Sequence, residues 1–167
     1  MSRLNTNRTE LGNNDFLVSK TDIKGRITYC NQLFMKVAGY SESELLGKPH
    51  NIVRHPDMPR VIFKLLWEKI QNKKEIFAYV KNRTKNGGYY WVYANVTPSI
   101  DDKGSIIGYY SVRRKVNEQA LSTIEDLYAR LLQEESRGGM EASQNYLNNL
   151  LKEKGVSYDE FVTSLQG

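Results

Sequence analysis

The 167-residue chain has little of what several common protein classes require. It holds one cysteine, Cys30, which excludes an internal disulfide and a multi-cysteine metal site and suits a reducing compartment. No apolar run approaches the roughly 18–20 residues that a transmembrane helix needs. The polar start of the chain lacks the apolar segment of a signal peptide. These absences predict a cytoplasmic protein without direct membrane insertion.

The sequence also lacks the residue patterns that carry catalysis. It contains no glycine-rich phosphate loop, no cluster of metal ligands and no nucleophile beside a general base, so we expect no enzyme. Hydrophobic residues make up 40% and charged residues 26% of the chain, which is typical of a globular protein. The length fits one domain with an extension.

Charge divides the chain into a basic and an acidic part. Residues 1–117 hold 20 basic and 10 acidic side chains, whereas residues 118–167 hold 4 and 9. The basic side chains are dispersed and no nucleic-acid-binding motif accompanies them, so we expect no nucleic-acid partner. The opposite charges favour docking of the acidic tail on the first part or on another basic surface.

Hydrophobic periodicity predicts an α+β domain. Two strands come first, then short helices and a longer helix over residues 58–71, and then three more strands. A sheet of five antiparallel strands would be covered on one face by the helices, and a cavity between the two layers is the natural ligand site. The predicted strands are residues 15–20, 26–30, 75–83, 89–97 and 105–115.

Alternation along the fourth strand assigns its two faces. Its small side chains are expected to face the helices, and its bulkier ones to face outward, where they need a cover from the N-terminal segment, the tail or a partner. The same rule turns alternate residues of the fifth strand inward. The expected inward residues are Val92, Ala94 and Val96, then Gly108, Tyr110 and Val112, and the expected outward residues are Trp91, Tyr93 and Asn95.

The tail is predicted to be a helical hairpin. Two amphipathic segments flank Gly138 and Gly139, and a capping box that begins at Ser157 starts a last short turn. The apolar stripes suit packing on the same chain, or contact with a second copy or a receptor. The predicted divisions are an N-terminal cap segment over residues 1–14, a sensor domain over 15–116 and the extension over 117–167.

Three motifs resemble PAS sensor domains over about residues 12–116. They are Ile-Thr-Tyr-Cys-Asn at 27–31, Gly-Tyr-Ser-Glu-Ser-Glu-Leu-Leu-Gly at 39–47 and Lys-Asn-Gly-Gly-Tyr-Tyr-Trp at 85–91. Within that family, Arg-His-Pro-Asp-Met-Pro at 54–59 and Val-Lys-Asn-Arg at 80–83 are similar to the FAD-binding sensors of aerotaxis and energy taxis. In architecture, a PAS domain with a short tail resembles the separate PAS subunits of bipartite energy-taxis receptors. The tail itself lies outside this resemblance.

The resemblance implies noncovalently bound FAD and a set of residues that retain it. Arg54 suits a diphosphate, and His55 and Asp57 can orient one another. Simpler functions stay open: a helix cap for Asn31, a salt-bridged loop for residues 54–57 and core packing for the aromatic residues. The expected cofactor-binding residues are Asn31, Arg54, His55, Asp57, Phe63, Trp67, Asn82, Val92, Ala94 and Tyr110.

The function implied is a redox or oxygen sensor that signals to a separate membrane chemoreceptor with HAMP and signalling domains. A homodimer through the outer sheet face or the tail is a further expectation. The alternatives are a haem-binding gas sensor that uses His50 or His55 as axial ligand, and an interaction module without a cofactor. Ile76 and Ala78 stand where the family carries Trp and Gly, which predicts a reshaped pocket. Cys30 is expected to be a buried residue without photochemistry.

Overall fold

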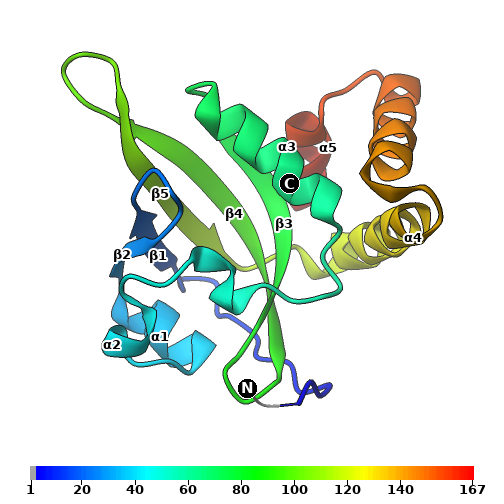
Figure 1. Ribbon diagram of the computed structural model, residues 1–167. Coiled ribbons are helices and arrows are strands. Elements are labelled where there is room, and N and C mark those ends of the chain that lie inside the picture. The colour runs from blue at the N-terminus through cyan, green and yellow to red at the C-terminus, as the bar shows by residue number, and fades with distance from the viewer. Residues whose placement is uncertain (1–2) are drawn as a thin grey trace.

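The computed structural model describes residues 3–167 and confirms the α+β architecture, as Figure 1 shows. A single antiparallel sheet has the strand order β2-β1-β5-β4-β3, so β1 pairs with β5 at its centre and β3 forms one edge. Four helices lie between β2 and β3 in the sequence. The strands are β1 (Leu17–Thr21), β2 (Ile27–Cys30), β3 (Ile76–Arg83), β4 (Tyr89–Ile100) and β5 (Ile106–Arg114).

The helices between β2 and β3 begin and end at capping residues, glycine and proline. Asn31 caps α1 (Gln32–Ala38), and Gly39 ends that helix in the left-handed conformation. Ser41 and Glu44 form a capping box at α2 (Glu42–Leu45). A short 3-10 helix, η1 (His50–Val53), then leads to α3 (Arg60–Gln71), which follows Pro59. These elements place His50, Arg54 and the α3 side chains over the inward face of the sheet.

The tail forms the predicted helical hairpin and a further helix. Helix α4 (Glu118–Lys154) is interrupted at Gly139, whose φ of 72° and ψ of −162° are non-helical. Gly155 ends its second arm. The capping box at Ser157 starts α5 (Tyr158–Gln166), a full helix where the sequence predicts only a short turn. Among residues 3–167, none of the helices combines the length and the apolar character needed to cross a membrane.

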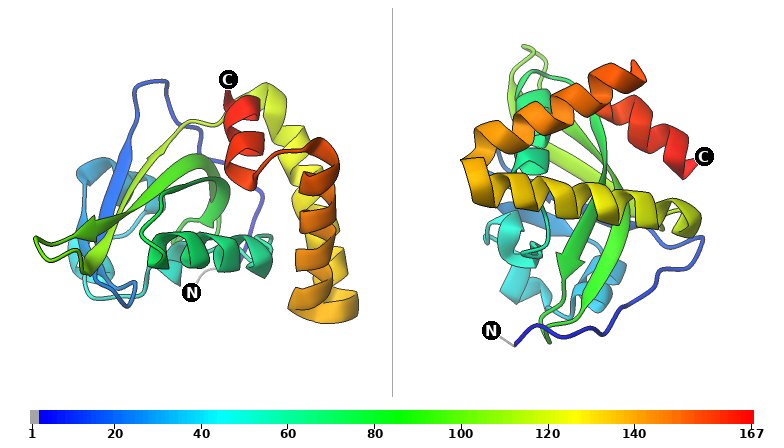
Figure 2. Two further views of the ribbon diagram at one scale, coloured as in Figure 1. Left: turned by 90° about the horizontal axis from the view of Figure 1, so that it is seen from above. Right: turned by 90° about the vertical axis from the view of Figure 1, so that its right-hand side faces the viewer.

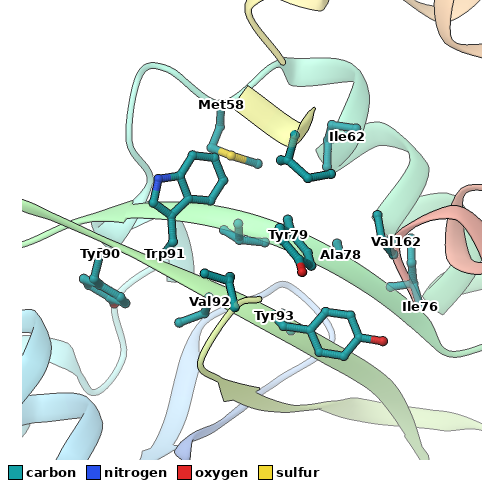
Figure 3. Packing of buried hydrophobic residues seen from close by; sticks show 14 of the residues in the cluster. Met58, Ile62, Ile76, Ala78, Tyr79, Tyr90, Trp91, Val92, Tyr93 and Val162 are labelled. Carbon is teal, nitrogen blue, oxygen red and sulfur yellow. The ribbon is translucent and has the colours of Figure 1, made fainter. Parts of the chain in front are cut away.

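The tail packs on its own domain and covers the outer face of β3 and β4. The Tyr128 hydroxyl donates to the Tyr79 carbonyl over 2.6 Å, and its ring lies 6.1 Å from that of Trp91. The hydroxyl groups of Tyr93 and Thr163 lie 3.1 Å apart. Figure 3 shows the large side chains that β3 and β4 contribute to this packing. The predicted outward face of β4 is therefore confirmed, and the tail is its cover.

Candidate functional site

A cavity of about 220 Å³ lies between the inward face of the sheet and the layer formed by η1 and α3. It is smaller than the roughly 300–1,000 Å³ of typical ligand sites, so it has room for one planar ring system, and the rest of a larger ligand would extend beyond it. Aromatic and aliphatic side chains form its walls, and basic and amide groups project into it. The lining includes Ser19, His50, Arg54, Phe63, Trp67, Asn82, Ala94, Tyr109, Ser111 and Arg113.

Five of the expected cofactor-binding residues line this cavity: Arg54, Phe63, Trp67, Asn82 and Ala94. An isolated backbone bridge joins Arg54 to Asn82, which brings the guanidinium and the amide to the same end of the cavity. The Arg54 guanidinium lies 3.7 Å from the centre of the Phe63 ring. Its Nε is buried without a hydrogen-bond partner in the described part of the chain, and burial lowers the pKa of the side chain. This donor is suited to an anionic ligand.

Asn31 lies outside the cavity lining and has a structural role. Its side-chain oxygen accepts hydrogen bonds from the backbone of Phe34 and Val18, and its amide donates to the Phe16 carbonyl. These three bonds join the start of α1 to β1. The helix-cap interpretation of Asn31 therefore matches the geometry.

His55 and Asp57 also lie outside the lining, in a loop that is tied to β3. The backbone amide of Asp57 donates to His55 Nδ1 over 3.0 Å, and the Asp57 carboxylate pairs with Lys81 at 2.7 Å. Burial raises the Asp57 pKa, but the hydrogen bond from Lys81, the charge of Lys81 and the interaction with His55 together outweigh burial, so the pKa is lowered. Burial and the charge of Lys81 lower the pKa of His55. Arg54 is the first residue of this salt-bridged loop, and the loop therefore fixes its position.

The face assignment of the fifth strand was wrong, and Tyr110 points away from the cavity. The hairpin pairs Ile100 with Ile106 but Ser99 with Gly108, so Ile107 is an extra residue and the register shifts by one. Such a shift moves every following side chain to the opposite face. Tyr109, Ser111 and Arg113 face inward in place of Gly108, Tyr110 and Val112. The fourth strand follows its prediction, although Val92 lies beside the lining rather than in it.

Arg113 is the least expected group in the cavity, because the residue is 3% exposed and no carboxylate among residues 3–167 neutralises it. It donates to the hydroxyl oxygens of Ser111 at 2.7 Å and Ser19 at 2.8 Å, and it lies over the Phe34 ring. Burial lowers its pKa to about 10, so the guanidinium remains charged at neutral pH. Its Nε has no partner among residues 3–167. A buried cation of this kind is costly unless a ligand compensates it.

His50 completes the polar group around Arg113. Its Nε2 lies 3.0 Å from the Ser19 hydroxyl and 3.3 Å from the Arg113 guanidinium. Because a guanidinium only donates, Nε2 must accept and the ring is neutral. Burial and the charge of Arg113 lower the pKa of His50 to about 3. The positive charge of Arg113 next to His50 Nε2 also disfavours binding of a haem iron ion to this nitrogen.

The charged residues of the lining are all cationic. It contains Lys24, Arg54 and Arg113 together with neutral His50, whereas no aspartate or glutamate of the described chain belongs to it. Trp67 and Tyr109 form an edge-to-face pair with centroids 5.4 Å apart near the turn that holds Lys24 and Gly25. The cavity therefore combines flat apolar walls with positive charge, which suits an aromatic ligand that carries negative groups.

Sequence reasoning did not select Ser19, Tyr109, Ser111 or Arg113, and it considered His50 only as a haem ligand. In the sequence, Arg113 stands in the basic run Arg113-Arg114-Lys115. The missing signal is the register shift in the β4–β5 hairpin, which places Arg113 opposite Ala94. Ile76 and Ala78, the departures from the family, are fully buried on the inward face and lie outside the lining.

Two known proteins are similar to this chain in sequence. The aerotaxis receptor of Escherichia coli (strain K12) is 42% identical over 123 residues, which are 74% of this chain and 24% of the receptor. The nitrogen fixation regulatory protein of Klebsiella pneumoniae is 27% identical over 60% of this chain and 20% of its own length. The chain thus spans about a quarter or less of the length of these two relatives.

Solved structures share the fold. The dark structure of the blue-light photoreceptor Aureochrome1 LOV matches with a TM-score of 0.57 and 24% identity over 70% of this chain and 84% of that one. A PAS domain from Colwellia psychrerythraea matches with a TM-score of 0.56 and 20% identity over 60% of this chain and 86% of that one. Residues 27–113 match the family model described as the PAS fold. The chain therefore belongs to the PAS family.

Proposed function

We propose that this PAS domain binds FAD noncovalently and acts as a redox sensor. The observation that carries the proposal is the buried Arg113 in a cavity whose lining holds two further cations and no carboxylate in the described chain. A ligand with negative charge relieves the cost of burying that guanidinium. The resemblance to the FAD-binding taxis sensors supports FAD as this ligand, and the aromatic walls fit its ring.

The residues of the cavity suit different parts of the cofactor. Phe63 and Trp67 on α3 lie on one side and Ala94 on the other, so they can enclose a planar ring. The Asn82 amide can both donate to and accept from the polar edge of a ring. Arg54, with its buried and unpartnered Nε, suits the diphosphate. Bound FAD would supply reversible electron uptake with a change in the charge and protonation of its ring.

Arg113 and His50 are placed to respond to that change. A charged guanidinium favours extra negative charge nearby, and the neutral His50 imidazole can adjust its hydrogen bonds with Ser19 and Arg113. Both groups connect to strands at the sheet centre, because Ser19 lies on β1 and Ser111 on β5. A change in the network would therefore reach the sheet.

The partner in this proposal is a separate membrane chemoreceptor with HAMP and signalling domains, and the domain works in the cytoplasm without catalysing a reaction. The support is the likeness to the aerotaxis receptor, of which this chain matches one part. The signal would pass by protein contact through the sheet face or the tail.

The proposal is tested by titrating cofactor-free protein with FAD, FMN and riboflavin and following ligand fluorescence. We expect FAD to bind most tightly and riboflavin most weakly, because the cations favour phosphate groups. Arg54→Ala should weaken FAD by tenfold or more, leave riboflavin binding nearly unchanged and keep a cooperative melt. Equal weakening of FAD and riboflavin binding would contradict the role of Arg54. Failure of FAD, FMN and riboflavin to bind at all would contradict the proposed function.

A further inference from the structure

Helix α3 is shared between the cavity and the tail. One side of the helix lines the cavity with Phe63, Leu66 and Trp67. The adjoining part of the helix surface carries Arg60 and Lys64, whose charged ends contact α4. A force that moves α3 therefore changes the cavity wall directly.

The contacts from α4 to α3 include a buried carboxylate. Arg60 Nε donates to Glu135 Oε1 over 3.0 Å, and the Glu135 side chain is only 7% exposed. Its Oε2 is buried without a partner among residues 3–167, so Arg60 is the cation that compensates this charge. Lys64 Nζ donates to Gln144 Oε1, which lies beyond the break at Gly139. Both arms of α4 thus hold α3.

The tail also holds the opposite wall of the cavity. The Tyr128 hydroxyl bonds to the carbonyl of Tyr79, and the next residue, Val80, lines the cavity from the other face of β3. At the end of the chain, Gln166 accepts from the Tyr79 hydroxyl and the Asn117 amide and donates to the Lys115 carbonyl. In the left view of Figure 2, α4 spans the edge of the sheet from the side of α5 to the side of α3.

We propose that the tail is a clamp that holds α3 against the sheet and so controls how firmly the cavity retains its ligand. The clamp residues are Arg60, Lys64, Glu135 and Gln144. Thermodynamic linkage requires reciprocity: if docking of the tail strengthens ligand binding, the ligand strengthens docking by the same factor. The ligand itself rests on the proposed function, whereas the mechanical link between tail and α3 does not.

The test compares Glu135→Ala with the matched control Glu134→Ala in the full chain. Both variants remove one carboxylate from the same turn of α4, but Glu134 pairs with Arg130 within α4, and within residues 3–167 it forms no hydrogen bond or ion pair with α3. Arg60 is 63% exposed, so it is solvated once Glu135 is lost and both variants should fold. Hydrogen exchange is measured by mass spectrometry without ligand and with excess FAD.

Without ligand, Glu135→Ala should speed exchange over α3 (Arg60–Gln71) by about fivefold or more relative to Glu134→Ala. With FAD, Glu135→Ala should speed flavin dissociation by a similar factor, and FAD should slow exchange in α4 and α5 of the unaltered protein. Equal exchange of α3 in the two variants would overturn the clamp. Failure of FAD to bind would contradict the proposed function instead, and the ligand-free comparison would still decide on the clamp.

Discussion

At the scale of single residues, the cavity is defined by charges that the protein does not neutralise itself. Arg113 is held by two serine hydroxyls and an aromatic ring, and the Nε atoms of Arg113 and Arg54 have no partner within the described residues. Replacing a buried charge with an apolar side chain is often neutral for stability, because the desolvation cost disappears with the charge. Such groups are therefore better explained by ligand binding than by folding.

Arg113→Met should separate these two roles. We expect the free energy of unfolding in urea to change by no more than about 1 kcal/mol and FAD affinity to fall by at least tenfold. Arg114→Met is the matched control, because Arg114 is the exposed neighbour whose guanidinium lies over Tyr93 on the outer face. A large loss of stability with unchanged FAD affinity would show that Arg113 is structural.

His50 should make stability depend on pH. Its pKa is near 6.5 in the unfolded chain and about 3 in the folded one, so between these values the unfolded state binds more protons. Stability should therefore fall as the pH falls below about 6.5. Unfolding in urea at pH 7 and pH 5 should show a drop that is larger in the unaltered protein than in His50→Gln, by up to about 2 kcal/mol. The same drop in both proteins would contradict the buried neutral state of His50.

At the scale of elements, local signals predicted more than long-range pairing did. The caps at Asn31 and Ser41, the α3 periodicity and the break at Gly139 all depend on neighbouring residues, and the structure contains each of them. The register of β4 with β5 depends on one extra residue in their hairpin, and no local pattern identifies it. That single shift removed Tyr110 from the predicted site and introduced Arg113.

The break in α4 should be sensitive to its glycine. Gly139 has a φ of 72° with a ψ of −162°, a conformation that essentially only glycine adopts. Gly139→Ala should destabilise the hairpin by about 1–3 kcal/mol. Gly155→Ala is the comparison: its φ of 66° and ψ of 30° lie in the left-handed region, which costs alanine about 1 kcal/mol. Thermal melts in which Gly155→Ala is the more damaging change would contradict the described geometry.

At the scale of the whole molecule, the protein has three layers: the tail, the sheet, and the helices that enclose the cavity. The tail residues Ile124, Leu131 and Leu147 belong to the same buried cluster as the sheet residues Ile76 and Tyr79. A ligand in the cavity should therefore stabilise all three layers together. The acidic tail and the basic first part meet in specific pairs such as Arg60 with Glu135.

Binding of FAD should raise stability by the amount that mass action requires. With free FAD at about 100 times its dissociation constant, the free energy of unfolding should rise by about 2.7 kcal/mol. Fluorescence of the two tryptophans, Trp67 in the cavity and Trp91 beneath the tail, should report a single shared transition. If FAD shifted the unfolding transition of one layer and not of the others, the result would contradict the cooperative packing.

The most direct test of the central claim is the visible absorption spectrum of the purified protein, recorded before and after anaerobic reduction, with the released ligand identified by chromatography against FAD and FMN. We predict a two-banded flavin spectrum that bleaches on reduction, and release of FAD. A single intense Soret band, or a colourless protein that takes up no flavin on reconstitution, would contradict the account.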